Sequence, residues 1–427
     1  MNVAVIGIGR IGLPVAAKIA SLGHQVFGCD INAERVAMVN RGENPIPDEA
    51  GLSALLKEVI SSGKLTATTE TRTAVAKCDA VLFAVAVDVD DQGLADLRNL
   101  LAATDEVARG LQPGTLCIFD TTLPVGTTRR VLAPRLEAGG LRLGEDLFVA
   151  FSPERLLMGR VIEDLAKYPK VVGGLDPESG RRAAAFFAEV LGGEVMELAS
   201  AESAELGKLS EGVYRDLNIA LANELAQVAD VHGVDINEVI RAANSQPYCH
   251  IHVPGTGVGG HCIPVYPRFL MQDDGPSSLA ALGRRVNDSM PGYAARRVAG
   301  LLGGLDGKRV LILGLTFRPD VAVTPHTNSV DLLREFQALG AEVLGHDALL
   351  SETGVRELGF DPAPEPLSGF DVAVLHANHR AYAGLDWKTV APLLVDARNA
   401  LDREKVEAMG VRYLGIGRPV SGQATTR

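Results

Sequence analysis

Short, continuous hydrophobic runs along the chain alternate with longer segments in which apolar residues recur every three or four positions. The runs have the length of buried strands and fall into two series. The first series lies at residues 3–6, 25–29, 80–87, 115–120, 147–151 and 170–173. The second lies at residues 308–315, 342–346, 371–376, 393–396 and 412–414. Because strands that alternate with helices form parallel, doubly wound sheets, we expect an α/β protein with two such domains.

One long helical pattern lies between the two series, from about residue 200 to residue 231, and contains no proline. A helix of this length typically bridges domains or packs against a partner chain. We therefore expect three domains, at residues 1–198, 199–300 and 301–427, with the long helix in a central helical domain. The apolar stripe of this helix consists of Leu206, Leu209, Val213, Leu217, Leu221, Leu225 and Val228.

A glycine-rich turn directly follows the first predicted strand. Gly7, Gly9 and Gly12 have the GxGxxG spacing, a helical pattern follows, and the next strand ends in Asp30. This is the dinucleotide fingerprint of a Rossmann domain, in which the glycines admit the pyrophosphate and the acid binds the ribose hydroxyls. Asp30 repels a 2′-phosphate and so favours NAD over NADP, although Arg35 weakens that preference. A glycine turn without a ligand, in another kind of α/β protein, is the alternative.

Two polar segments follow later strands of the first series. Residues 121–126 read Thr-Thr-Leu-Pro-Val-Gly, and residues 152–155 read Ser-Pro-Glu-Arg. Doubly wound sheets bind ligands beyond the carboxyl ends of their strands. We therefore expect both segments to line a ligand site, and a helix cap or a simple turn is the alternative for each.

A second glycine-rich loop, at residues 254–264, presents a cysteine. Gly255, Gly257, Gly259 and Gly260 remove side chains from the backbone immediately before Cys262. A loop without side chains lets a substrate carbon approach the sulfur, whereas a turn with a small buried cysteine is the structural alternative. His250, His252 and His261 are nearby in the sequence, but their spacing is not that of a zinc site, and we expect no metal.

Net charge, hydrophobic runs and cysteine content argue against nucleic-acid-binding and membrane proteins. The net charge of −12 argues against a nucleic-acid groove and against binding to an anionic membrane. No hydrophobic run approaches the length of a membrane span. We expect no leader, because no basic region or cleavage site stands before the first strand. Five scattered cysteines suit a reducing compartment, so we expect a cytoplasmic protein whose Cys29, Cys78 and Cys117 belong to the core.

Taken together, these segments resemble the UDP-glucose/GDP-mannose dehydrogenase family over essentially the whole chain. Residues 152–155 and 254–262 are most similar to the branch of UDP-N-acetylmannosamine and UDP-N-acetylglucosamine 6-dehydrogenases. The motifs that carry the resemblance lie at residues 7–14, 121–128, 152–155, 204–208, 223–224, 254–264 and 314–320.

The resemblance implies that a sugar C6 alcohol is oxidised to a carboxylate by two NAD, through a thiohemiacetal and a thioester on cysteine. It also implies a UDP-binding third domain, a homodimer formed through the central helix, and a role in polysaccharide biosynthesis. The implied catalytic residues are Cys262, Lys208, Glu154 and Thr122. The implied cofactor-binding residues are Gly7, Gly9, Arg10, Ile11, Gly12, Asp30, Arg35 and Thr122. The implied substrate-binding residues are Arg155, Leu156, Lys208, Arg215, Gly259, Phe317 and Arg318.

The chain departs from the family pattern at four places. Gly212 stands for an asparagine one turn after the lysine, and Tyr266 for an aspartate four residues after the cysteine. Tyr248 replaces an arginine, and Pro325-His326-Thr327 replaces an Arg-Glu-Ser motif. These changes leave three hypotheses open: a complete 6-dehydrogenase, a variant with an altered substrate or two-electron chemistry such as epimerisation, and a non-catalytic nucleotide-sugar binder. The sugar and the nucleotide base also remain open.

Overall fold

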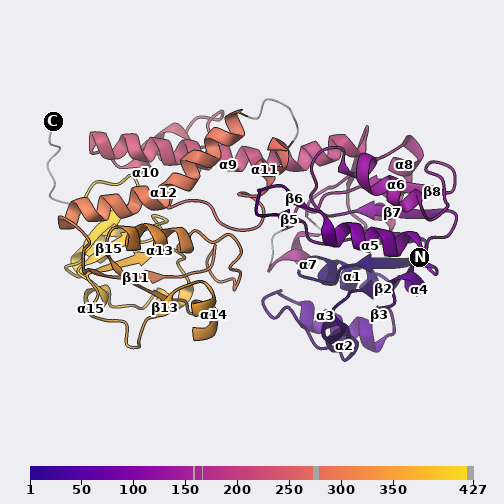
Figure 1. Ribbon diagram of the computed structural model, residues 1–427, viewed down its shortest axis with the longest axis horizontal. Coiled ribbons are helices and arrows are strands. Elements are labelled where there is room, and N and C mark those ends of the chain that lie inside the picture. Colours follow the sequence, from indigo (N-terminus) through magenta and orange to yellow (C-terminus); the bar gives the residue numbers. More distant parts are fainter. Residues whose placement is uncertain (157–158, 166, 273–277, 421–427) are drawn as a thin grey trace. The chain divides into compact units, whose positions relative to one another are not determined.

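The computed structural model describes residues 1–156, 159–165, 167–272 and 278–420 (Figure 1). Residues 421–427, with which the predicted third domain ends, lie outside the described residues. The chain divides into two compact units, and the division falls inside the long helix, between Glu211 and Gly212. The first unit consists of Met1–Glu211 and the segment that begins at Arg268, and the second unit of the other described residues.

The first unit is built around one sheet whose strand order is β10-β9-β8-β7-β4-β1-β2-β3. Its strands are β1 (Asn2–Ile6), β2 (Gln25–Cys29), β3 (Leu65–Thr68), β4 (Ala80–Phe83), β7 (Thr115–Phe119), β8 (Leu147–Phe151), β9 (Lys170–Gly174) and β10 (Val195–Leu198), with a small ribbon of β5 (Asp88–Val89) and β6 (Ala95–Asp96). Its helices are α1 (Gly12–Ser21), α2 (Ala33–Asn40), α3 (Leu52–Ser61), α4 (Thr71–Val75), α5 (Arg98–Ala108), a π-helical turn (Thr128–Leu132), α6 (Ala133–Glu137), α7 (Val161–Asp164) and α8 (Pro177–Leu191).

Neighbouring strands of this sheet run parallel except at one place. β9 pairs with β8 in the antiparallel direction, with Phe151 opposite Gly173. The amino end of β9 therefore lies at the same edge of the sheet as the carboxyl ends of β4, β7 and β8. This edge carries both polar segments that the sequence singled out, and it also receives Lys170, the first residue of β9.

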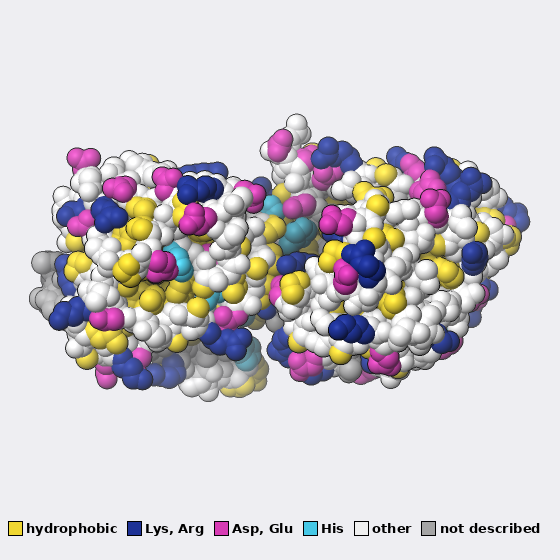
Figure 2. Space-filling model, turned by 90° about the horizontal axis from the view of Figure 1, so that it is seen from below, with side chains coloured by type: hydrophobic (Ala, Val, Ile, Leu, Met, Phe, Trp, Pro, Cys, Tyr) yellow, Lys and Arg dark blue, Asp and Glu magenta, His cyan; other side chains and the backbone are white. Residues whose placement is uncertain are grey.

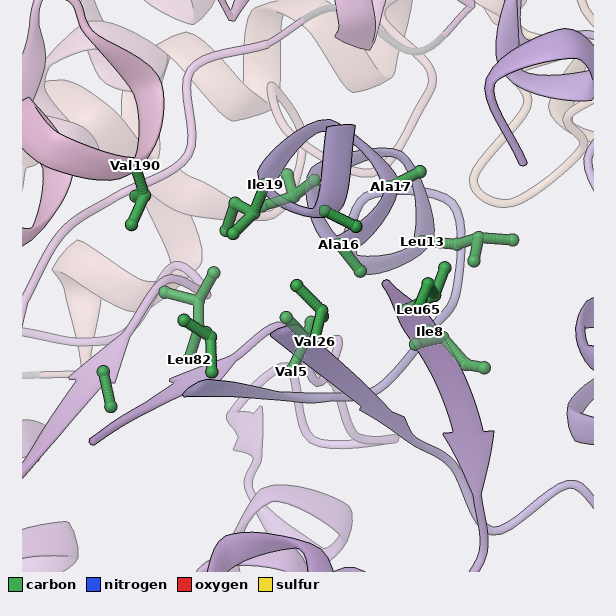
Figure 3. Packing of buried hydrophobic residues seen from close by; sticks show 14 of the residues in the cluster. Val5, Ile8, Leu13, Ala16, Ala17, Ile19, Val26, Leu65, Leu82 and Val190 are labelled. Carbon is green, nitrogen blue, oxygen red and sulfur yellow. The ribbon is translucent and has the colours of Figure 1, made fainter. Parts of the chain in front are cut away.

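The core of the first unit forms where α1 packs on the sheet (Figure 3). The buried residues Ala16 and Ile19 of α1 face Val5, Val26 and Leu82 of β1, β2 and β4. Short alanines on the helix let its backbone lie close to the strands. The packing fixes the start of α1, and with it the glycine turn, against the sheet edge.

The second unit contains a parallel sheet with the order β13-β12-β11-β14-β15-β16. Its strands are β11 (Arg309–Leu313), β12 (Glu342–His346), β13 (Asp361–Pro362), β14 (Val372–Leu375), β15 (Leu393–Asp396) and β16 (Arg412–Gly415). Helices α13 (Ser329–Ala338), α14 (Glu352–Glu357), α15 (Trp387–Val390) and α16 (Arg403–Ala408) and a 3₁₀ turn (Arg380–Tyr382) connect them. The remaining helices are the long helix α9 (Ala201–His232), α10 (Ile236–Ala243), α11 (Tyr266–Met271) and α12 (Ser278–Leu302).

Within the second unit, helix α9 buries mainly small residues beside the leucine stripe that the sequence predicted, although Leu225 of that stripe packs against the core. Within the second unit its buried positions include Ala220, Ala222, Asn223 and Ala226, whereas Leu221 is 50% exposed. The small alanines allow α12 to pack closely beside α9. Polar bonds complete this contact, for example Asn223 Nδ2 to Asn287 Oδ1 at 2.9 Å and Arg284 Nη1 to Asp216 Oδ1 at 2.7 Å.

The expected α/β class, with two doubly wound sheets and a central helical region around one long helix, is confirmed. On the face that Figure 2 presents, acidic and basic side chains are interspersed rather than gathered by sign. Among the described residues, no helix combines the length and the apolar character that crossing a membrane requires.

Candidate functional site

At each of the three positions of the first turn, glycine is present for a different structural reason. Gly7 has a φ of +89°, which L side chains rarely adopt. A Cβ at Gly12 would lie 1.8 Å from the Gly7 carbonyl oxygen, so only glycine lets α1 begin there. A Cβ at Gly9, in contrast, would meet no atom within 4 Å. The open space at Gly9, beside a first turn of α1 that no side chain caps, fits the pyrophosphate of a dinucleotide.

The acid after β2 is held by the same turn. Asp30 Oδ2 accepts hydrogen bonds from Ile8 N at 3.1 Å and from Arg35 Nη1 at 3.0 Å. Asp30 thus neutralises the guanidinium that had weakened the expectation of NAD. Arg10 forms an ion pair with Asp48 at 2.7 Å, and Ile11 is the residue before α1.

A lysine that the sequence analysis did not single out joins two carboxylates at the sheet edge. Lys170 Nζ lies 2.7 Å from Asp120 Oδ1 and 2.8 Å from Glu154 Oε2. Burial raises the pKa of Asp120 to about 7, although the Lys170 ammonium opposes this shift. Burial by itself would lower the pKa of Lys170, but the charges of Asp120 and Glu154 outweigh it and raise that pKa. Glu154 is thus fixed at one oxygen by an ammonium group, while its Oε1 accepts from Arg155 N at 2.8 Å.

Glu154, Arg155 and Leu156 line a pocket of the first unit together with Lys170 and Phe187. Arg155 Nη1 lies 3.2 Å from Glu211 Oε1, and Lys208 Nζ lies 4.0 Å from Glu211 Oε2. Glu211 therefore lies between the two cations, of which Lys208 is only 8% exposed.

The turn that follows Thr122 is tied to the start of α9 by a buried glutamate. Glu205 Oε1 accepts hydrogen bonds from the Thr128 backbone N at 2.9 Å and from Thr128 Oγ1 at 2.7 Å. Thr122 itself is half-buried in the loop between β7 and this turn. The sequence-predicted residues Thr122, Glu154, Arg155, Leu156 and Lys208 thus all belong to the first unit.

Cys262 belongs to the second unit, where a tyrosine reaches its sulfur. The Tyr266 hydroxyl donates to Cys262 Sγ at 3.3 Å, and Tyr266 N donates to the Cys262 carbonyl at 3.0 Å. The cysteine loop and the first turn of α11 therefore form one hydrogen-bonded unit. Tyr266 is 8% exposed, and its ring lies against Gly212 of α9.

The glycines before Cys262 pack tightly on the segment that follows β11. Gly260 has a φ of +93°, and a Cβ there would lie 2.7 Å from the Phe317 ring. A Cβ at Gly259 would lie 2.7 Å from the His326 carbonyl oxygen and 3.0 Å from Phe317 Cβ. The loop therefore lies next to Phe317. The same segment carries Arg318, whose carbonyl accepts from Thr316 Oγ1 at 3.1 Å.

The other predicted positions of the second unit are more exposed. Arg215 is exposed on α9, and Tyr248 is 93% exposed. Pro325 and His326 are exposed, whereas Thr327 is buried and donates from Oγ1 to the Leu315 carbonyl at 2.7 Å. The triplet that replaces the family's Arg-Glu-Ser motif thus contributes one buried polar anchor.

The five cysteines fall into two groups. Cys29, Cys78 and Cys117 are buried, as predicted. Burial raises the pKa of Cys29 and of Cys78 to about 12, which keeps both as unreactive thiols near neutral pH. Cys249 and Cys262 are partly exposed. Within the described ranges, no group of three or more His, Cys, Asp or Glu side chains is arranged to hold a metal ion.

Asp120, Lys170 and the Tyr266 hydroxyl were not predicted. Lys170 starts a strand that the sequence places in the parallel series, and only the antiparallel direction of β9 brings it to Glu154. The four-residue spacing of Cys262 and Tyr266 was a signal that could have suggested their contact, because residues four apart meet where a helix begins.

Comparison with known proteins gives matches along most of the chain. Models of the UDP-glucose/GDP-mannose dehydrogenase family match as NAD binding domain at residues 1–191, as central domain at residues 202–288 and as UDP binding domain at residues 311–403.

Individual relatives match over nearly their full length. A UDP-N-acetyl-D-mannosamine dehydrogenase of Pyrococcus horikoshii is 32% identical, over 98% of this chain and 99% of its own. An NDP-N-acetyl-D-galactosaminuronic acid dehydrogenase of Ralstonia solanacearum is 33% identical, over 95% of this chain and 98% of its own. The solved structure of a UDP-D-ManNAc dehydrogenase from Pyrococcus horikoshii superposes with a TM-score of 0.89, at 31% identity, and covers 98% of this chain and 99% of its own.

Proposed function

Because the chain belongs to the UDP-glucose/GDP-mannose dehydrogenase family and is an NAD-dependent oxidoreductase, we propose that it oxidises the C6 alcohol of a UDP-N-acetylhexosamine to the carboxylate. The observation that carries this proposal is Cys262, a partly exposed residue at the end of a glycine-rich loop, with a hydroxyl donor 3.3 Å from its sulfur. Bound NAD would accept one hydride from the substrate carbon in each of two oxidations. The turn of Gly7, Gly9 and Gly12, with Asp30, would hold it.

Cys262 keeps the substrate bound between the two oxidations. Its thiolate attacks the carbon of the aldehyde that the first oxidation forms. A carbon–sulfur bond forms while the carbonyl electron pair moves to oxygen and takes up a proton, which gives a thiohemiacetal. The second oxidation removes a hydride from the same carbon and a proton from the hydroxyl, leaving a thioester. Water then adds, the carbon–sulfur bond breaks, and the thiolate and a carboxylate are released.

In the proposed reaction, residues of the first unit act on the hydrolytic water and on the alkoxide that develops on the substrate. We infer that Glu154 orients the hydrolytic water, because Lys170 and the Arg155 backbone amide fix its carboxylate from both sides. Lys208 would carry the positive charge that favours the thiolate and the developing alkoxide, and Thr122 would contribute to the binding of the nicotinamide. Residues that would contact the substrate are Arg155, Leu156, Lys208, Arg215, Gly259, Phe317 and Arg318.

The choice of sugar is supported by the relatives rather than by any single contact. The two curated relatives described above are dehydrogenases whose names refer to N-acetylated sugars. We therefore propose UDP-N-acetylmannosamine as the first substrate to test, and polysaccharide biosynthesis as the use of its product.

We further propose that the enzyme acts as a cytoplasmic homodimer formed through α9. Tyr214, Leu221 and Val228 recur every seventh residue, so they lie on one face of the helix. They are 54%, 50% and 48% exposed. An exposed apolar stripe of this kind supports self-association of the helix.

The test measures NADH released, and the mass of the product, with UDP-N-acetylmannosamine, UDP-N-acetylglucosamine, UDP-glucose, UDP-glucuronate and GDP-mannose. Cys262→Ser should abolish formation of the acid, whereas the matched control Cys249→Ser should leave it unchanged. Unchanged acid formation by Cys262→Ser would reject the cysteine mechanism. One NADH per substrate, or none, would indicate two-electron chemistry or epimerisation, and calorimetric binding without NADH would indicate a non-catalytic binder.

A further inference from the structure

We propose that Tyr266 is a catalytic residue whose hydroxyl donates a hydrogen bond to Cys262 and holds its sulfur as the thiolate. The inference rests on the proposed function of Cys262 and adds a residue to it. Tyr266 occupies the position where the family pattern has an aspartate, and nothing in that pattern assigns a phenol to the sulfur.

The contact is built into the local backbone. Tyr266 is the first residue of α11, and its amide donates to the Cys262 carbonyl at 3.0 Å. This bond fixes the tyrosine one helical turn after the cysteine. The ring then returns toward the loop, and its hydroxyl lies 3.3 Å from Cys262 Sγ. With only 8% of the tyrosine exposed, water competes little for the hydroxyl.

The second departure from the family pattern makes room for the first. A Cβ at Gly212 would lie 2.7 Å from Tyr266 Cδ2 and 3.0 Å from Tyr266 Cβ. Any larger residue, including the asparagine of the family pattern, would push the ring out of its place beside the sulfur. The departures from the family pattern at Gly212 and Tyr266 are therefore coupled. Because residue 212 of α9 has no side chain, the phenol ring of Tyr266 of α11 has room beside the sulfur.

A hydrogen bond to an anion is stronger than one to a neutral group. The Tyr266 hydroxyl therefore stabilises the thiolate of Cys262, which is the nucleophilic form of the sulfur, more than its thiol. Titratable and charged groups on the segments beside the loop include His261 and His326, whose rings lie 6.3 Å apart, and Arg398, which donates to the Gly257 carbonyl at 3.3 Å. Arg318 is carried by the segment of Phe317, against which Gly259 and Gly260 pack.

The test follows alkylation of Cys262 by iodoacetamide against pH, in the full-length protein, with the modified peptide quantified by mass spectrometry. Tyr266→Phe keeps the ring and removes only the hydroxyl. We expect it to raise the midpoint pH of alkylation by about one unit. The rate at the high-pH plateau should not fall, because a less stabilised thiolate is the stronger nucleophile. An unchanged midpoint, or a plateau that falls without a shift, would overturn the proposal.

Gly212 provides an independent arm that leaves the hydroxyl in place. Gly212→Ala should raise the midpoint in the same direction, because the added methyl displaces the ring. Combined with Tyr266→Phe it should add no further shift, since both changes remove one interaction. The matched control is Gly300→Ala on α12, where an added Cβ meets no atom within 4 Å and the midpoint should stay unchanged. Additive shifts of Gly212→Ala and Tyr266→Phe would contradict the coupling.

Failure of this inference is distinguishable from failure of the proposed function. If Cys262→Ser abolishes acid formation while Tyr266→Phe leaves the alkylation midpoint unchanged, only the role of Tyr266 is wrong. If Cys262→Ser retains acid formation, the cysteine mechanism itself is wrong.

Discussion

At the scale of single residues, two glycines of the same turn, Gly9 and Gly12, are present for different structural reasons. Gly12 is required by the fold, because its Cβ would collide with the Gly7 carbonyl. Gly9 faces open space, so the fold does not require a glycine there. The difference separates a residue that holds the turn together from one that leaves room for a ligand.

Alanine at each of these two positions should therefore have different effects. Gly9→Ala should weaken NAD binding about tenfold or more while leaving the thermal midpoint of the ligand-free protein unchanged. Gly12→Ala should lower that midpoint, because the collision costs about 1–3 kcal/mol or more. Calorimetric titration with NAD and thermal unfolding without it measure the two effects. A Gly9→Ala protein with wild-type NAD affinity would show that Gly9 does not face the cofactor.

Residue spacing was sufficient to predict the glycine turn after β1, the acid Asp30 after β2 and the glycine-rich loop before Cys262. Each of these features depends on a short segment of chain. The four-residue spacing of Cys262 and Tyr266 permits their contact, but it does not show that the tyrosine ring has room beside the sulfur. That room comes from Gly212, which is 54 positions before Tyr266 in the chain. A contact between segments so far apart depends on tertiary packing, which one sequence does not reveal.

At the scale of elements, the direction of a strand is what the hydrophobic pattern could not supply. A buried strand has the same run of apolar residues whether it lies parallel or antiparallel. β9 was expected within a parallel series, but it pairs with β8 in the antiparallel direction. That direction creates the cluster of Asp120, Glu154 and Lys170. β3 and β10 were not predicted, because each has only four residues and polar positions interrupt its apolar run.

Removal of the ammonium from this cluster should destabilise the first unit strongly. Lys170→Met leaves two buried carboxylates facing each other, and breaking a buried pair costs about 3–5 kcal/mol. Lys167→Met is the control, because its partner Glu163 is exposed and a surface pair contributes about 0–1 kcal/mol. Hydrogen exchange of the β8 and β9 amides reports the local stability. Equal protection in the two variants would mean that Lys170 does not stabilise the sheet edge.

At the scale of the whole molecule, a buried histidine in the second unit predicts sensitivity to acid. His376 follows β14 and is fully buried, and burial lowers its pKa from 6.5 to about 3. The unfolded chain therefore binds a proton that the folded chain does not bind between these two pH values. His376 thus contributes its full stability above pH 6.5, and this contribution is lost as the pH falls toward 3.

At about pH 5 the loss from His376 alone should amount to about 2 kcal/mol. His376→Gln should therefore lose less stability than the wild-type protein between about pH 7 and pH 5, whereas the control His232→Gln, at an exposed position, should not differ from wild type. Thermal unfolding at both pH values gives the comparison. An identical loss in His376→Gln and wild type would show that this histidine is not the acid-sensitive group.

The most direct test of the central claim is the number of NADH formed per molecule of nucleotide sugar consumed by the wild-type protein, with product mass measured in the same sample. Capture of the aldehyde on Cys262 requires both oxidations to occur before release. We expect two NADH per UDP-N-acetylhexosamine and a product with the mass of the carboxylic acid. One NADH with a released aldehyde or keto sugar would contradict a reaction carried through a cysteine-bound intermediate.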